Sequence, residues 1–78
     1  MKFTELKTGQ KARVTALLKG DKVYRQRLIA MGILPGTEFT VSRLAPLGDP
    51  IEIEIRGFAL SLRKNEAAMI QIEQVKGR

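Results

Sequence analysis

The clearest pattern in the chain is the strict alternation of isoleucine and glutamate over residues 51–55, IEIEI. A period of two places Ile51, Ile53 and Ile55 on one face of a β-strand and the two glutamates on the other. Shorter alternating runs predict four more strands, over residues 13–18, 38–44, 58–62 and 69–75. The side chains expected to face the core from these four strands are Val14, Ala16, Leu18, Phe39, Val41, Phe58, Leu60, Leu62, Ile70 and Ile72.

Residues 21–32, DKVYRQRLIAMG, have the spacing of apolar residues that is typical of an α-helix. Its apolar positions recur at i, i+4 and i+7 and form one stripe, made of Tyr24, Leu28 and Met31. Asp21 is suited to the N-cap, because its side-chain oxygen accepts hydrogen bonds from the first free amides. Gly32 stands where a left-handed glycine ends a helix, and Ile33 is then expected to fold back onto Leu28.

Glycine and proline mark the turns. The segment LPGT, residues 34–37, has Pro35 and Gly36 at the two central positions, which predicts a type II turn. In APLGDP, residues 45–50, each proline holds the preceding residue in an extended conformation, so a stiff loop is expected. Residues 56 and 57 can form a two-residue hairpin, although arginine is a poor first residue for a type I′ turn, and residues 63–68 predict a short turn or one 3₁₀ turn.

Five short strands with one α-helix between the first and the second predict a mainly β fold. Closure into a small barrel removes exposed strand edges, so an SH3-like five-stranded barrel with an inserted helix fits best. A five-stranded oligonucleotide-binding barrel is the main alternative, although its helix normally comes later in the chain. We expect one domain over residues 1–75 and a flexible tail over residues 76–78.

The composition excludes most catalytic and metal-binding chemistry. The chain contains no histidine, the commonest general base and transition-metal ligand, and no cysteine, so a thiolate metal site is excluded. We therefore expect a protein that is not an enzyme and that holds no cofactor and no metal of its own. A membrane span needs about 20 apolar residues, and no apolar run in the chain approaches that length. No signal-peptide pattern is present either, so a cytoplasmic protein is expected.

The net charge of +6 lies in the front third of the chain. Residues 1–27 carry eight Lys/Arg and two Asp/Glu, whereas residues 28–78 carry six of each. Such a basic face suits nucleic acid, an anionic membrane surface or an acidic protein partner, or is simply solvated. The cations of the region that includes the helix are Lys11, Arg13, Lys19, Lys22, Arg25 and Arg27. Only Tyr24 is available there for base stacking, so nucleic-acid binding is not expected.

Two other features raise candidate sites. Glu52 and Glu54 share a strand face and, with Asp49, offer oxygen ligands for a hard cation, but these are too few to fix the ion and the polar face of an alternating strand explains them better. Leucines occupy turns, where polar residues usually lie; they are Leu34, Leu44 and Leu47. These leucines either close the barrel ends or form an exposed apolar patch of the kind that marks a partner site.

The chain closely resembles the FeoA family, ferrous iron transport protein A. The matching pattern is a helix ending in Met-Gly, then PG, an alternating strand, AP.GDP, a second alternating strand, and G..L.LR..EA before a final apolar strand. The matched positions are Leu28, Met31, Gly32, Pro35, Gly36, Ala45, Pro46, Gly48, Asp49, Pro50, Gly57, Leu60, Leu62, Arg63, Glu66 and Ala67. The resemblance implies an SH3-like barrel that works with FeoB, the membrane GTPase of bacterial ferrous iron uptake.

The resemblance and the residues together predict a cytoplasmic accessory protein that docks on FeoB and modulates it. We expect Leu34, Leu44 and Leu47 to form the contact and Lys22 and Arg25 to steer association with an acidic partner or the inner membrane. A transition-metal-responsive module, related to the C-terminal domain of metal-dependent repressors, and a nucleic-acid-binding barrel are the alternatives. A weak homo-oligomer through the same leucines also stays open.

Overall fold

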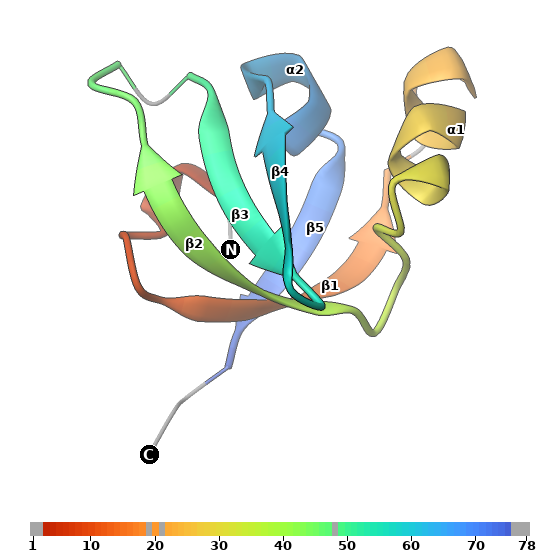
Figure 1. Cartoon of the computed structure of the whole chain (residues 1–78). Helices are drawn as coiled ribbons and strands as arrows, with labels where there is room; N and C mark the ends of the chain where they lie inside the picture. The colour runs from red at the N-terminus through yellow and green to blue at the C-terminus, as the bar shows by residue number, and fades with distance from the viewer. Residues whose placement is uncertain (1–2, 19, 21, 48, 76–78) are drawn as a thin grey trace.

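The computed structural model describes residues 3–18, 20, 22–47 and 49–75 (Figure 1). The predicted N-cap Asp21 and the predicted tail over residues 76–78 lie outside the described residues. The described residues form five strands, a 3₁₀ helix and two α-helices. They are η1 (Phe3–Glu5), β1 (Lys11–Leu17), α1 (Lys22–Ala30), β2 (Glu38–Leu44), β3 (Ile51–Ile55), β4 (Phe58–Leu62), α2 (Lys64–Ala67) and β5 (Ile70–Gln74).

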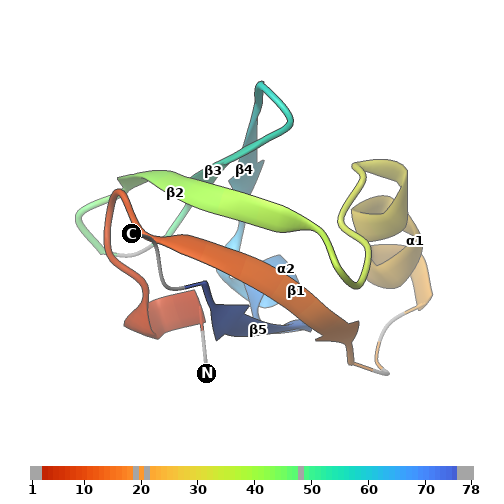
Figure 2. The same ribbon diagram turned by 90° about the horizontal axis from the view of Figure 1, so that it is seen from below.

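The strands form one curled antiparallel sheet in the order β4-β3-β2-β1-β5 (Figures 1 and 2). The mainly β architecture is as expected, but the prediction of a closed barrel is wrong. The two edge strands, β4 and β5, do not pair over the described residues. The segment that joins them forms the helix α2, where only a turn or a 3₁₀ turn was predicted.

No helix in the described part of the chain is long and apolar enough to cross a membrane.

The core lies inside the curl of the sheet and follows the alternation of the strands. Its fully buried side chains include Val14, Phe39, Val41, Ile53 and Leu62, all of which were expected to face inward. The residues around η1 also contribute, because the Phe3 ring stacks on Phe39 with 5.1 Å between centroids.

Two side chains that were expected to face the core are exposed. Leu18 is 40% exposed, because the register of β1 against β5 shifts between Val14 and Ala16 and the alternation does not continue to the strand end. Phe58 is 71% exposed, because it begins an edge strand directly after the hairpin turn, beyond the covered part of the sheet. The prediction that Phe58 points into the core is therefore wrong.

The end of α1 has the predicted geometry. Gly32 has φ +89°, its N–H donates to the Ile29 carbonyl at 3.0 Å, and the Ile33 N–H donates to the Leu28 carbonyl at 2.9 Å. This pair of bonds is the Schellman ending. Leu28 and Ile33 are both fully buried, so the same ending anchors α1 on the sheet and turns the chain toward β2.

Gly32→Ala is expected to lower the free energy of unfolding by about 1–2 kcal/mol, because a Cβ disfavours the left-handed conformation. A Cβ at this position meets no atom within 4 Å, so the cost is conformational and not a clash. Urea unfolding curves measure the loss. Gly32→Asn is the matched control, because asparagine adopts this conformation more readily. An equal loss in both variants contradicts the conformational explanation.

The two turns that follow also match their predictions. Gly36 has φ +93°, and the Thr37 N–H donates to the Leu34 carbonyl at 3.0 Å, as in a type II turn. Positive φ at both Arg56, 51°, and Gly57, 82°, makes the β3–β4 connection a type I′ hairpin.

The loop between β2 and β3 is fastened to α2. The Lys64 N–H, at the first turn of α2, donates to Asp49 Oδ1 at 3.0 Å. One oxygen of the aspartate in the APLGDP loop therefore satisfies a free helix amide, which is a structural role.

Candidate docking surface

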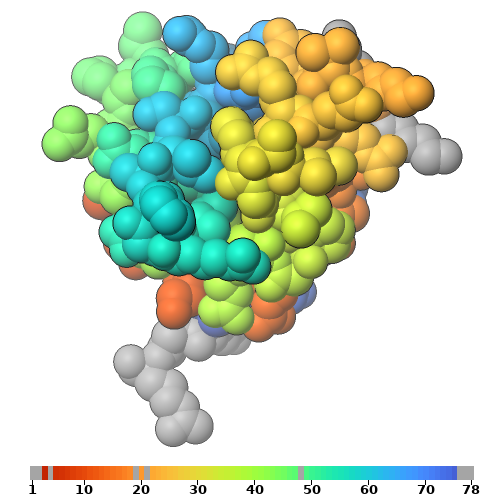
Figure 3. Space-filling view, turned by 45° about the vertical axis from the view of Figure 1, so that its right-hand side comes forward, coloured from red at the N-terminus to blue at the C-terminus, as the bar shows by residue number. Residues whose placement is uncertain are grey.

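Apolar side chains, of which Phe58 is the most exposed, line a pocket between the C-terminal end of α1 and the edge strand β4. We call this pocket, of about 300 Å³, the α1–β4 groove. In the space-filling view the yellow end of α1 lies beside the cyan β3–β4 hairpin (Figure 3). The residues that line the groove are Ala30, Met31, Gly32, Ile55, Arg56, Phe58, Ala59 and Leu60.

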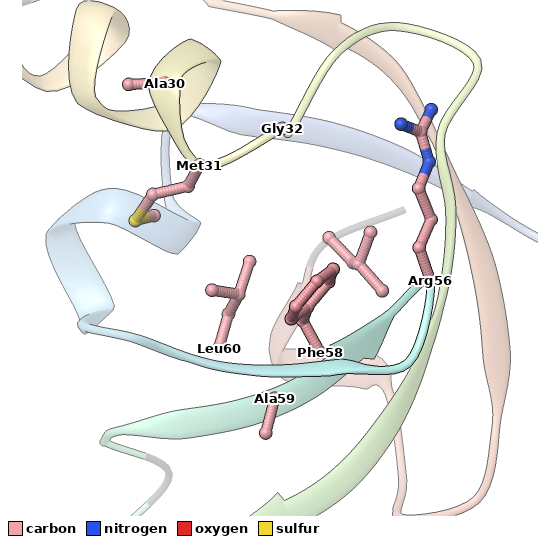
Figure 4. A pocket seen from close by; sticks show the side chains of 8 residues that line it. Ala30, Met31, Gly32, Arg56, Phe58, Ala59 and Leu60 are labelled. Carbon is pink, nitrogen blue, oxygen red and sulfur yellow. The ribbon is translucent and has the colours of Figure 1, made fainter.

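The strand wall of the groove is built by the alternation of β4. The side chains of Phe58 and Leu60 point toward the end of α1, and Ala59 points the other way (Figure 4). Met31 faces them from the helix side (Figure 4). Phe58 is mostly exposed, whereas Met31 and Leu60 are half-buried and pack against the core. A large aromatic side chain held in water beside two partly covered apolar side chains is typical of a partner-binding surface.

Arg56 supplies a positive charge at one end of the groove (Figure 4). The type I′ turn holds the residue at the hairpin tip. Within the described ranges Arg56 makes no ion pair, since the bridges found there join Arg13 or Arg27 to glutamates. Its guanidinium is therefore free to meet a carboxylate of a partner.

A second pocket, of about 250 Å³, lies between α1 and α2 and is lined by Tyr24, Arg27, Arg63, Asn65 and Glu66. Glu66 is only 4% exposed. Its Oε1 accepts a hydrogen bond from the Arg63 N–H at 3.0 Å, and its Oε2 lies 3.8 Å from the Arg27 guanidinium. The buried carboxylate thus links the two helices, and the two arginines beside it make the pocket unsuitable for a cation.

The structure does not bring the predicted leucines together. Leu34 is 43% exposed before β2, and Leu47 is 94% exposed after it, so the seven residues of β2 separate them. Leu44 is half-buried at the end of β2 and packs against the core, as a side chain that closes the sheet end does. Leu34 lies two residues after Gly32, which lines the α1–β4 groove, whereas Leu47 lies far along the chain from it.

The basic residues expected to bind a partner fall into two groups, one exposed and one held in ion pairs. Lys22 and Arg25 are exposed on α1, the helix that forms one wall of the groove. Arg13, in contrast, bridges Glu38 at 3.1 Å and Glu73 at 2.8 Å across neighbouring strands. These hydrogen bonds to Glu38 and then Glu73 raise the pKa of Arg13. Arg13 is thus engaged within the sheet and is not available to a phosphate.

The carboxylates do not assemble into a metal site. Glu52 Oε1 lies 3.1 Å from the Ser42 hydroxyl, which donates to it, and Asp49 is bonded to α2. No group of three or more acidic, histidine or cysteine side chains that could hold a metal occurs in the part of the chain that the structure describes. The polar face of an alternating strand accounts for Glu52 and Glu54.

The sequence pattern does not reveal the groove, because it predicts Phe58 in the core, Met31 in the helix stripe and Arg56 in a turn. One signal was available: arginine is unfavourable at the first position of a type I′ turn, so its presence there suggests a use other than the turn itself.

Comparison with known proteins identifies relatives over nearly the whole chain. A family model described as FeoA domain matches residues 1–74. A fusion of Fe(2+) transport protein A with the Fe(2+) transporter FeoB, from Porphyromonas gingivalis, is 39% identical over 75 residues, which are 96% of this chain. The chain spans only 9% of the length of that fusion protein.

Solved structures agree with this result. The FeoA-like protein of Clostridium acetobutylicum is 37% identical with a TM-score of 0.86, over 100% of this chain and 90% of that one. FeoA of Stenotrophomonas maltophilia, described as a prokaryotic SH3 domain protein in complex with zinc, is 22% identical over 94% of this chain and 89% of that one, with a TM-score of 0.79. At that identity the likeness supports the SH3-like fold alone. The matching family model and the 39% identical relative together show that the chain belongs to the FeoA family.

Proposed function

We propose that this protein is an accessory component of bacterial ferrous iron uptake that docks on the cytoplasmic part of a FeoB transporter and modulates it. The observation that carries the proposal is the fusion protein, in which a FeoA-like segment and FeoB form one polypeptide. Fusion keeps two proteins that act together at a high effective concentration. Where the two are separate polypeptides, the FeoA-like protein has to achieve the same association through its own surface.

The α1–β4 groove is the surface best suited to this contact, because Phe58, Met31 and Leu60 offer apolar area beside a free arginine. Docking modulates the transporter only if the two conformations of FeoB bind this chain with different affinity. The proposal assigns no catalytic step to this chain.

Residues around the groove are proposed to assist. Leu34 extends the apolar surface next to the end of α1, and Lys22 and Arg25 place positive charge on the exposed side of that helix. With a net charge of +6, the chain is attracted to an acidic partner and to the anionic inner leaflet beside it. Charge of this kind mainly accelerates association, so high salt is expected to slow binding.

Co-purification tests the docking itself. The chain is co-expressed with the FeoB transporter of the same organism, extracted in mild detergent and purified through a tag on FeoB, with and without guanine nucleotide. We expect the chain to elute with FeoB in stoichiometric amount in at least one nucleotide state. Elution without the chain in every state contradicts the proposal.

Leu47→Asp tests whether the contact reaches the far end of β2. We propose that Leu47, almost fully exposed, adds to the interface, and the charged variant is expected to weaken binding to FeoB by roughly threefold to tenfold. The free energy of unfolding is expected to stay within about 0.5 kcal/mol, since an exposed loop residue is changed. A folded variant that binds FeoB as tightly as the wild type removes Leu47 from the interface.

A further inference from the structure

We propose that the edge strand β4 binds its partner by β-strand addition: an extended segment of FeoB lies in the α1–β4 groove and pairs with the β4 backbone. The inference rests on the proposed function and specifies the mode of contact. Strand addition uses a free sheet edge for affinity and side-chain pockets at alternate positions for specificity, and complementary charges help to select the segment. The described residues offer all three.

The free edge follows from the topology. β4 pairs with β3 on one side only, from Ile55 opposite Phe58 to Ile51 opposite Leu62. In a two-residue hairpin the pair that flanks the turn exchanges backbone hydrogen bonds, so the next position along the strand directs its N–H and C=O outward. Ala59 and Ser61 occupy these outward positions, and the strand order places no described strand beside them.

The groove borders this edge on the face of the sheet that looks toward α1, because the edge-strand residues Phe58, Ala59 and Leu60 line it. A strand added at the edge places its own side chains alternately, like those of β4. Side chains on the helix side then meet Phe58 and Leu60 on one wall and Met31 on the other. The segment is therefore expected to carry apolar residues at two alternate positions.

The charges identify the rest of the segment. Arg56 lies at the hairpin end of the groove without an ion pair among the described residues. Toward the other end, Arg27 lies one helical turn before Ala30, and Arg63 lies three residues after Leu60. Glu66 offsets only part of this charge, through its 3.8 Å approach to Arg27. The complementary segment has acidic residues at its two ends and apolar residues between them.

The other edge strand is a poorer acceptor. The exposed side chains of β5, those of Gln71, Glu73 and Gln74, are polar. Neither of the two pockets described above borders this strand. An edge with polar side chains and no flanking pocket has little to hold an added strand beyond its backbone. We therefore assign the contact to β4.

The test replaces the outward backbone donor of β4. Ala59→Pro removes an N–H that does not serve the β3–β4 ladder, whereas Ala59→Val keeps it and retains strand propensity. With full-length FeoB in detergent, we expect Ala59→Pro to bind at least about tenfold more weakly than the wild type and Ala59→Val to bind within about twofold. Equal binding by a folded Ala59→Pro variant overturns strand addition and leaves the proposed function intact.

Hydrogen exchange on the wild-type complex gives an answer that does not depend on the variant folding. The amides of Ala59 and Ser61 are expected to exchange at least about tenfold more slowly with FeoB bound. Unchanged exchange at both amides in a formed complex overturns the inference alone, and no complex at all overturns the proposed function together with it. A dimer of the isolated chain in light scattering that Ala59→Pro abolishes assigns the edge to a second copy, which also overturns it.

Discussion

Phe58→Glu is expected to weaken binding to FeoB by at least about tenfold, the largest effect of any single exposed residue in this chain. Phe58 is 71% exposed and contributes the largest apolar side chain of the α1–β4 groove. Aromatic residues that become fully covered dominate the free energy of association at interfaces. Glutamate removes that area and leaves a carboxylate without a partner in an apolar contact.

The fold is expected to tolerate this change. Because Phe58 is outside the core, the free energy of unfolding should change by less than about 1 kcal/mol. Thr15→Glu on β1 alters the net charge by the same amount at an exposed site away from the groove, and it is expected to bind nearly as the wild type does. Binding by Phe58→Glu at the level of Thr15→Glu places the interface elsewhere.

Leu28→Ala is expected to lower the free energy of unfolding by about 2–5 kcal/mol. Leu28 is fully buried, is the one buried side chain of α1 and accepts the closing hydrogen bond of the Schellman ending. The loss leaves a cavity between the helix and the sheet. A domain of this size has a total stability of only about 4–12 kcal/mol, so the variant unfolds far more readily.

Ile29→Ala is the matched control, because it removes the same kind of side chain from the exposed side of the same helix. Its cost is expected to stay below about 1 kcal/mol. Urea unfolding followed by circular dichroism measures both variants. Equal losses contradict the placement of Leu28 as the anchor of α1 and, with it, the position of the helix wall of the groove.

Local patterns predicted the strands and their turns well. The alternation of IEIEI, the Schellman glycine Gly32 and the type II turn at Gly36 each depend on residues that are close in the chain. A period of two or a required positive φ is legible without knowledge of the rest of the fold. The helix end at Gly32 was predicted together with the return of Ile33 onto Leu28, and the structure adds the backbone hydrogen bond between these two residues.

Features that depend on distant segments were not predictable in this way. The open sheet edge and the exposure of Phe58 depend on how the strands are arranged relative to one another. The groove arises only when residues 30–32 and 55–60 meet in space. For the same reason the sequence does not show that Leu34 and Leu47, which both lie in turns, are placed at opposite ends of β2.

The proposed docking on FeoB, with different affinity for its two conformations, is tested most directly by titrating the labelled wild-type chain into detergent-solubilised FeoB held with GDP or with a non-hydrolysable GTP analogue. We predict saturable one-to-one binding with dissociation constants that differ by at least about threefold between the two states. Equal affinity in both states contradicts modulation, and the absence of saturable binding in either state contradicts docking itself.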